Sequence, residues 1–401
     1  MTGPTVVPLR SKEFWQDPYP ILDAARAQHR TAVSESGEPV ILSIADLEAV
    51  SAHPIMVPLG LEALDRLGIT EGPFRDWRAL SLNARDRDDH RRLRTLVGRA
   101  FTPLQTQRVR PLVREFVHDL LDELVDAGTM DVQQQFAREV PLFAICVFLG
   151  IPEEDRYEIE ALHFGTEEGF GWPMTPERKQ RADDGIIGLY DYSRRLVERR
   201  RSDPQDDLVT ALVNVEEAGD RLSEDELLAM VVNLIGGAIG STSSAITNAA
   251  YLFATHPDQA RLLRTETSLD REAVEEVLRF APPFRSTRRK ALDAVEVAGL
   301  SLAPGDSVFL SRQAANRDPE RFERPHDFDI RRGDTNHASF GHGPHFCLGQ
   351  ALARVNLTEA VPALVRRCTD LELDCEPARI PFDPVEKFDA LTIRFRGASR
   401  P

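Results

Sequence analysis

Cysteine is scarce in this chain. Its 401 residues include four cysteines, Cys146, Cys347, Cys368 and Cys375, and no two of them have C-x-x-C spacing. Four cysteines are too few for a disulfide framework in a chain of this length, and the spacing disfavours a structural zinc site. Cys146 lies in an apolar run, and Cys368 and Cys375 lack glycine or histidine neighbours. Only Cys347 therefore has a sequence environment that suggests chemistry.

The chain also lacks a long hydrophobic run and an excess of positive charge. The longest apolar run, residues 140–151, contains Pro141 and is shorter than the roughly 20 residues that span a bilayer. The first 15 residues do not show the charged and then apolar pattern of a signal peptide. With 65 acidic and 49 basic residues, the net charge is −16. We therefore expect a cytoplasmic protein that binds neither nucleic acid nor membranes.

Most of the chain has the periodicity of helices. Residues 109–127 and 357–367 repeat apolar positions every three or four residues. Strand signals cluster near residue 40 and at residues 295–312. The pattern predicts a mainly α fold with a small, mostly antiparallel β subdomain, and the chain length leaves open one domain with a subdomain or two domains. The proline-rich residues 316–328 are expected to form ordered chain without helix or strand.

One predicted helix is unusually long. Ser223 and Glu226 form a capping box, and helical character continues until Pro257 ends it. At about 1.5 Å per residue, this helix is roughly 45–50 Å long. Three glycines lie at its middle: Gly236, Gly237 and Gly240. Each costs about 1 kcal/mol relative to alanine, so either a bulky group lies against the helix there or another helix packs closely.

Residues 340–349, FGHGPHFCLG, surround Cys347 with glycine and precede a predicted helix. A helix N-terminus favours the thiolate, which is the form that binds metals or attacks electrophiles. Three uses of such a cysteine are compatible with the pattern: a nucleophile with His342 or His345 as its base, a redox switch, or an axial metal ligand.

These residues resemble a known motif. Phe340, Gly343, His345, Cys347 and Gly349 match the F-x-x-G-x-[H/R]-x-C-x-G haem-binding loop of cytochrome P450. The resemblance implies a triangular-prism fold in which the long helix lies over haem b (iron protoporphyrin IX), with the Cys347 thiolate bound to the iron. It further implies a monooxygenase that inserts one atom of dioxygen into a small organic substrate.

Other residues match the family at the expected places. Glu276 and Arg279 supply its E-x-x-R pair, with the arginine expected to bind residues 316–328. His90 and Arg94 lie four residues apart and share a helix face. By resemblance, four residues should hold the haem propionates through charge-assisted hydrogen bonds: His90, Arg94, Arg289 and His345. Without the Cys347 loop, exposed basic residues would explain His90 and Arg94 equally well.

The long helix departs from the family where protons should be delivered. The family motif A-G-x-[D/E]-T places an acid before an alcohol, whereas this chain has Gly240 at the acid position and Ser241 after it. Ser241 is the expected catalytic alcohol, and a shift of one residue would select Thr242 instead. A substrate group or an ordered water could replace the acid, peroxide could be the oxidant, or the reaction could differ from hydroxylation.

Electron delivery points to a partner protein. Residues 75–114 contain eleven arginines and four acids, a local charge of +7 (11 − 4) in a chain of −16. Arg91 and Arg92 should point away from the His90 and Arg94 face, where they could attract an acidic electron donor. By resemblance, the donor is a [2Fe–2S] or similar ferredoxin with its reductase, and the electrons come ultimately from NAD(P)H. A solvated helix with no partner is the alternative.

Four parts of the chain are expected to face the substrate. The segments expected to face it, residues 56–77, 163–174 and 282–286 and the centre of the long helix, are compatible with a largely apolar pocket. An aromatic or terpenoid-like compound fits this pattern. The missing acid leaves two alternative functions open, a peroxide-driven or otherwise non-hydroxylating haem-thiolate enzyme and a non-catalytic haem protein that binds gases.

Overall fold

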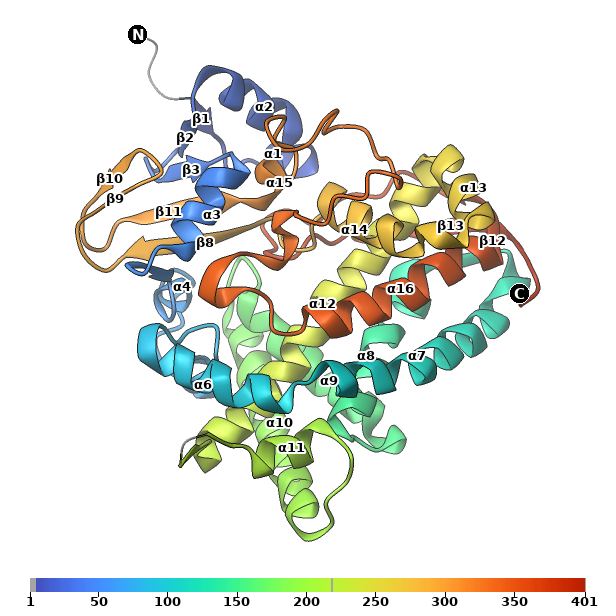
Figure 1. Ribbon diagram of the computed structural model, residues 1–401, viewed down its shortest axis with the longest axis horizontal. Helices are drawn as coiled ribbons and strands as arrows, with labels where there is room; N and C mark the ends of the chain where they lie inside the picture. Colours follow the sequence, from blue (N-terminus) through green and yellow to red (C-terminus); the bar gives the residue numbers. More distant parts are fainter. Residues whose placement is uncertain (1–4, 218, 401) are drawn as a thin grey trace.

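The computed structural model describes residues 5–217 and 219–400, in which a sheet-rich part lies beside a larger helical body (Figure 1). The helices are α1 Lys12–Gln16, α2 Tyr19–Gln28, α3 Ile44–Ala52, α4 Glu62–Asp65, α5 Pro73–Leu80, α6 Arg87–Ala100, α7 Pro103–Leu124, α8 Glu139–Leu149, α9 Arg156–Glu167, α10 Pro176–Ser202, α11 Leu208–Asn214, α12 Glu224–Thr255, α13 Pro257–Thr265, α14 Asp270–Phe280, α15 Arg312–Ala315 and α16 Gln350–Arg367. The predicted mainly α fold is confirmed.

The strands form one larger sheet and three small ones. They are β1 Val6–Val7, β2 Thr31–Ser34, β3 Pro39–Ile41, β4 Met56–Pro58, β5 Thr129–Asp131, β6 Glu216–Glu217, β7 Asp220–Arg221, β8 Ser286–Ala291, β9 Val295–Val297, β10 Leu300–Leu302, β11 Ser307–Ser311, β12 Cys368–Leu373 and β13 Thr392–Gly397. The larger sheet has the order β1-β2-β3-β11-β8-β4. Its β1–β2 and β3–β11 pairs are parallel, so the expected mostly antiparallel sheet is mixed in these two places.

Helix α12 starts and ends where the sequence predicts. The Ser223 side chain accepts a hydrogen bond from the Glu226 N–H, the Glu226 side chain reaches back to the Ser223 N–H, and the helix ends at Thr255. Among the described residues, α12 is the only helix long and apolar enough to cross a bilayer, and 61% of its apolar window is buried in the protein. A buried core helix of a soluble protein meets the same test of length and composition.

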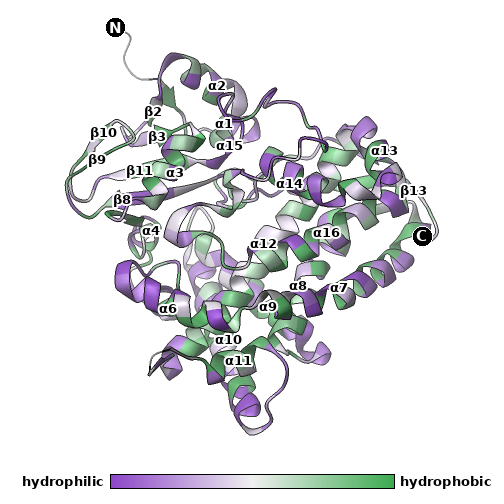
Figure 2. Ribbon diagram, viewed as in Figure 1, coloured by the Kyte–Doolittle hydropathy of each residue, from purple (hydrophilic) through white to green (hydrophobic). Residues whose placement is uncertain are grey.

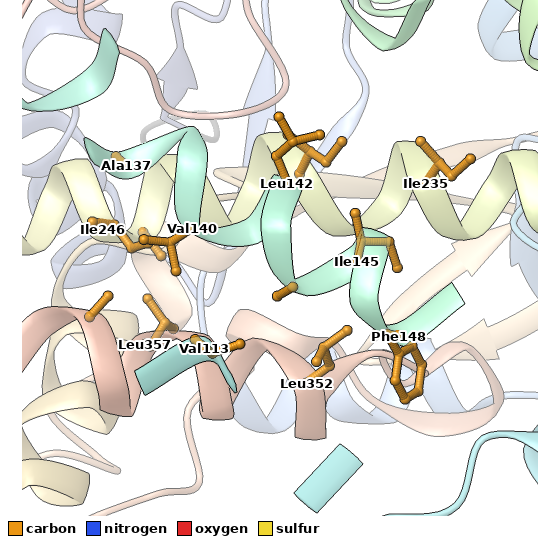
Figure 3. Close-up of a cluster of buried hydrophobic side chains, with 14 of the residues drawn as sticks. Val113, Ala137, Val140, Leu142, Ile145, Phe148, Ile235, Ile246, Leu352 and Leu357 are labelled. Carbon is orange, nitrogen blue, oxygen red and sulfur yellow. The ribbon is translucent and has the colours of Figure 1, made fainter. Parts of the chain in front are cut away.

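The main hydrophobic core lies where α12 packs between other helices. Ile246 of α12 lies beside Val140 of α8, with Val113 of α7 and Leu357 of α16 on the opposite side, and Ile235 lies farther along α12 (Figure 3). These five side chains are at most 1% exposed, and burying each stabilises the fold by about 1.5–3 kcal/mol. Figure 2 shows α7 banded with hydrophobic and hydrophilic residues, as expected for a helix with one buried face.

The Glu276–Arg279 pair fastens α14 to the irregular chain that follows β11 and α15. Arg279 Nε and Nη2 donate to the two Glu276 carboxylate oxygens at 2.7 and 2.8 Å, and both side chains are almost fully buried. Arg279 also donates to the carbonyls of Asn316, Pro325 and Asp327 at 2.9, 2.9 and 3.1 Å. The predicted link between the arginine and residues 316–328 is confirmed.

Candidate active site

The Cys347 loop is bent by two glycines and lies against α3. Gly341 and Gly343 have φ values of +75° and +70°, a left-handed conformation that favours glycine. A Cβ at Gly343 would lie 2.6 Å from the Ser51 carbonyl oxygen, so no side chain fits there without movement. The Cys347 N–H donates to the Phe340 carbonyl at 2.9 Å, and α16 begins three residues later. The glycines therefore serve to hold the cysteine in position.

The surroundings of the Cys347 thiol act on its pKa in opposite directions. Burial raises the pKa of the Cys347 thiol, and this effect outweighs the lowering by the Gly349 N–H, Arg312 and Arg94. The sequence predicts that the helix terminus favours the thiolate. The Gly349 N–H does lower the pKa of Cys347, but burial raises it by more. A metal ion that binds the sulfur removes its proton, so metal ligation is the use of this cysteine that burial opposes least.

Two histidines from distant parts of the chain lie together beside the loop. The rings of His90 on α6 and His345 have their centroids 3.9 Å apart and are tilted by 33°. Burial, reinforced by nearby cations, lowers the pKa of His90 to about 4 and that of His345 to about 3. Both imidazoles are therefore neutral at pH 7 in this arrangement.

Three arginines complete a cationic group around these rings. Burial lowers the pKa of Arg94, and it lowers the pKa values of Arg289 and Arg312 to about 10. His90 Nε2, Arg289 Nε and Arg312 Nε are buried without a hydrogen-bond partner. In the described ranges, no carboxylate forms an ion pair with any of the three arginines. Buried cations need an anion, so the group fits a ligand with two carboxylates.

The face of helix α12 that carries Gly236 and Gly237 has open space in front of it. A Cβ at Gly236 or Gly237 would meet no atom within 4 Å. Ser241 lies one turn after Gly237, donates to its carbonyl at 3.4 Å and is partly exposed. Thr242 is only 4% exposed. Ser241 therefore lies on the same face as Gly237, and Thr242 lies in the packed part of the helix.

Known proteins share both the sequence and this arrangement. The cytochrome P450 family model matches residues 177–384. The 6-deoxyerythronolide B hydroxylase of Saccharopolyspora erythraea is 38% identical over 308 residues, which cover 77% of this chain and 75% of the relative. Cytochrome P450 monooxygenase PikC of Streptomyces venezuelae is 36% identical over 398 residues, 96% of this chain and 92% of that protein. The crystal structure of CalO2 has a TM-score of 0.91 and 31% identity, with 98% of this chain and 100% of that chain covered.

The chain belongs to the cytochrome P450 family. It is accordingly an oxidoreductase, a haem-thiolate monooxygenase that uses haem iron and oxygen, acts on a small molecule and receives electrons from redox partners. The residues of this cytochrome P450 fit a haem: a cysteine on a glycine-bent loop, unpaired buried cations for two propionates, and a helix face without side chains at Gly236 and Gly237.

Sequence reasoning missed Arg312. No motif marks this residue, which is the first residue of α15 directly after β11. The antiparallel register of β8 and β11, with Ser286 opposite Ser311 and Arg289 opposite Val308, brings Arg312 to the same end of the sheet as the Cys347 loop. A register prediction for the two strands would have been the only sequence signal available.

Most of the arginines predicted to form a basic docking surface are paired within the chain. Arg92 binds Glu226 and Asp220, and Arg91, whose side chain is 77% exposed, pairs with Asp88. Further pairs are Arg75–Asp65, Arg85–Asp89, Arg108–Asp206, Arg110–Glu359 and Arg114–Glu359. The local charge of +7 is therefore largely neutralised by acids of other segments, which the linear count did not include.

A surface cavity that contains arginines lies behind the Cys347 loop. It has a volume of about 700 Å³ and is lined by residues of α7, α14 and α16. Three of its arginines pair with acids of the lining, Arg110 with Glu359, Arg354 with Glu275 and Arg366 with Asp270, whereas Arg271 is exposed. Arg354 stacks on the Phe340 ring at 4.4 Å, and Phe340 binds the cysteine backbone. This cavity is thus in direct contact with residues that support Cys347.

One segment expected to face the substrate is partly structural. Phe74 and Trp77 of α5 turn inward, and Phe74 packs against Phe170 with ring centroids 5.1 Å apart. Both are at most 6% exposed. Phe284, by contrast, is 37% exposed. Phe164 and Trp172, in residues 163–174, are also exposed, by 43% and 55%.

Proposed function

We propose that this cytochrome P450 acts as one cytoplasmic catalytic domain, residues 1–401, that takes electrons from a ferredoxin and inserts one atom of dioxygen into an organic substrate. The observation that carries the proposal is the group of arginines beside the Cys347 thiol, Arg289 buried and Arg94 and Arg312 partly buried, that have no carboxylate partner among the described residues. A dianionic cofactor that also binds sulfur through a metal satisfies both features.

Each residue of the site has a role in this proposal. Cys347 binds the iron of haem b, and the haem supplies oxygen activation when it is bound. Four residues bind the propionates together with Arg312: His90, Arg94, Arg289 and His345. Gly236 and Gly237 allow the flat cofactor to lie against α12, and Ser241 donates a hydrogen bond and passes protons on the oxygen side. Thr242 packs α12.

The substrate proposal follows the relatives. One of them is a 6-deoxyerythronolide B hydroxylase and another is the polyketide biosynthesis cytochrome P450 PksS of Bacillus subtilis. We therefore propose a polyketide-type compound as the substrate, in place of the aromatic or terpenoid-like class that the sequence suggests. The electrons come from NAD(P)H through a reductase and a [2Fe–2S] or similar ferredoxin.

The first experiment asks for the cofactor and then for the product. The purified protein is reduced under carbon monoxide, and we expect the red-shifted Soret band of a thiolate-bound haem. Polyketide lactones, terpenoids and fatty acids are then supplied with ferredoxin, its reductase, NADPH and labelled dioxygen, and products are searched for the label. A carbonyl spectrum without the shift rejects the proposal. Product formed with hydrogen peroxide but not with ferredoxin favours the peroxide-driven alternative.

Arg94→Leu is expected to weaken haem binding. The change removes a charge-assisted hydrogen bond, which contributes about 1.5–3 kcal/mol, so the Kd for haem rises roughly ten- to a hundredfold. The rate at which the protein loses haem to an excess of apomyoglobin measures the effect. Arg91→Leu on the same helix is the matched control, because Arg91 is exposed and paired only with Asp88. Equal haem loss in the two variants would contradict the proposed role of Arg94.

Arg271→Glu is expected to slow electron delivery by ferredoxin. Arg271 is exposed and lines the cavity behind the Cys347 loop, and reversing a charge at a docking surface lowers the association rate and its dependence on salt. Stopped-flow reduction under carbon monoxide should be about tenfold slower at low ionic strength, with the difference lost at high salt. Arg194→Glu on α10 is the control. If Arg194→Glu slows reduction as much as Arg271→Glu, the donor does not dock at this cavity.

A further inference from the structure

A carboxylate from another helix lies where α12 lacks its acid. Glu167 is the last residue of α9. A Cβ added to Gly240 would overlap with Glu167 Oε1 and would lie 3.6 Å from Glu167 Cδ. The Glu167 carboxylate therefore occupies the volume that a side chain at position 240 would need. Glycine at 240 is what allows Glu167 to approach the helix.

Two titratable groups, Lys387 and His163, lie next to this carboxylate, and Asp383 pairs with the lysine. Lys387 Nζ lies 3.1 Å from Glu167 Oε2 and 3.6 Å from Asp383. His163 Nε2, on the same helix, lies 3.4 Å from Glu167 Oε1. Burial raises the pKa of Glu167, but His163 and Lys387 outweigh it and lower the pKa to about 2. Glu167 is thus ionised at neutral pH.

The segment that carries Lys387 is itself attached to α12. Ser244 Oγ, one turn after Gly240, donates to the Glu386 carbonyl at 2.5 Å. The ion pair is therefore fixed to the helix from both sides, by α9 and by residues 383–387. The Glu167 side chain is 25% exposed and the Lys387 side chain is 23% exposed. The carboxylate therefore lies at the border between the packed interior and solvent.

We propose that Glu167 supplies, from α9, the carboxylate that position 240 lacks, and that it directs protons to Ser241. This inference rests on the proposed monooxygenase function and identifies how its protons are delivered. It is an alternative to the three explanations of the missing acid that the sequence left open: a substrate group or ordered water, peroxide as the oxidant, or a reaction other than hydroxylation. Glu167 acts through Ser241 and is therefore a positioning residue.

The proton balance of the reaction defines the task. Converting a substrate RH and dioxygen to ROH and water consumes two electrons, supplied by ferredoxin, and two protons, supplied by bulk water. The ionised carboxylate accepts a hydrogen bond from a water molecule and orients the other proton of that water toward the Ser241 hydroxyl. Each proton passed on is replaced from solvent, so Glu167 ends each turnover with its charge unchanged.

The alternative is that Glu167 only joins α9 to residues 383–387 through its ion pair. Glu167→Gln and Lys387→Met distinguish the two roles, because both break the ion pair while only the first removes the carboxylate. Glu167→Asp is the conservative variant. The double variant Glu167→Ala with Gly240→Asp moves the carboxylate to α12, into the volume that Glu167 leaves.

The measurement avoids the need for a known substrate by using dioxygen as the probe. Haem-loaded protein is reduced, mixed with oxygenated buffer that contains reduced ferredoxin, and its return to the oxidised spectrum is followed in H₂O and D₂O, together with the peroxide formed. General acid–base groups contribute about 10²–10⁴-fold. We expect the return to the oxidised spectrum to be at least roughly tenfold slower in Glu167→Gln than in the parent protein, with a larger solvent isotope effect. Lys387→Met should change this rate less than about twofold. The carbonyl spectrum and unfolding temperature should stay unchanged.

The rescue decides between a relay and a structural role. If Glu167→Ala with Gly240→Asp recovers the rate that Glu167→Ala loses, and Glu167→Asp keeps most of it, the carboxylate is the working group. Equal losses in Glu167→Gln and Lys387→Met, or no loss in Glu167→Gln, would overturn the inference while leaving the monooxygenase intact. Failure of the proposed function would give a different result, because the unmodified protein would then lack the carbonyl spectrum of a thiolate-bound haem.

Discussion

Replacing Cys347 with alanine is expected to abolish the red-shifted carbonyl band and to reduce monooxygenation to background. The variant keeps the glycine-bent loop and its hydrogen bond from the Cys347 N–H to Phe340, so the loss should come from the missing sulfur and not from unfolding. Without thiolate donation, oxygen–oxygen cleavage loses its electronic support. Carbonyl difference spectra and product formation under labelled dioxygen measure the two effects.

Cys375→Ala is the matched control for this experiment. Cys375 is the exposed free cysteine of the chain's described part, and its replacement should leave spectrum and turnover unchanged. Thermal unfolding of the haem-free Cys347→Ala protein should stay close to that of the haem-free parent. A persistent shifted band in Cys347→Ala would show that another residue binds the iron, and the proposed site would be wrong.

The second large effect is expected from Arg279→Met. The variant removes both Arg279 hydrogen bonds from the Glu276 carboxylate, which keeps the Asp329 N–H and Arg332 as its donors, and it leaves the carbonyls of Asn316 and Pro325 without the Arg279 donor. Breaking a buried ion pair costs about 3–5 kcal/mol, and the unpaired carbonyls add to this. The free energy of unfolding in urea should fall by at least that amount, and most of the expressed protein should be insoluble.

Two further variants bracket this result. Arg324→Met removes an exposed i,i+3 pair with Asp327 in the same irregular segment, and a surface pair of this kind contributes less than about 1 kcal/mol. Arg279→Lys keeps the charge but lacks the planar fork that reaches Glu276 and the carbonyls together, so its loss should be intermediate. A stability of Arg279→Met equal to that of Arg324→Met would contradict the structural role of the buried pair.

Local patterns in the sequence predict much of this molecule. The capping box at Ser223 and the proline at 257 give both ends of α12, and the alternating residues after Val295 give β9 and β10. Ser241 follows from helix periodicity once Gly237 is placed on the open face. In each of these cases the decisive interaction connects residues a few positions apart, which the linear sequence displays.

The features that could not be predicted depend on tertiary contacts. Glu167 meets Gly240 because α9 packs against α12, and no sequence pattern near either residue predicts this contact. Some arginines of residues 75–114 pair with acids more than 100 positions away, as Arg92 does with Asp220 and Glu226. Burial reverses the expected direction of the Cys347 pKa for the same reason, since burial is a property of the assembled fold.

The apolar length of α12 has a consequence for how the protein is made. Its last residue, Thr255, is translated 95 residues before α16 starts at Gln350 (350 − 255). At about 5–20 residues per second, the nascent chain waits roughly 5–20 s before the helix that covers this face leaves the ribosome. During that interval a segment apolar enough to cross a bilayer is covered by α8 and α10 but not yet by α16. Slow, cool expression with abundant chaperones should therefore raise the yield of soluble protein.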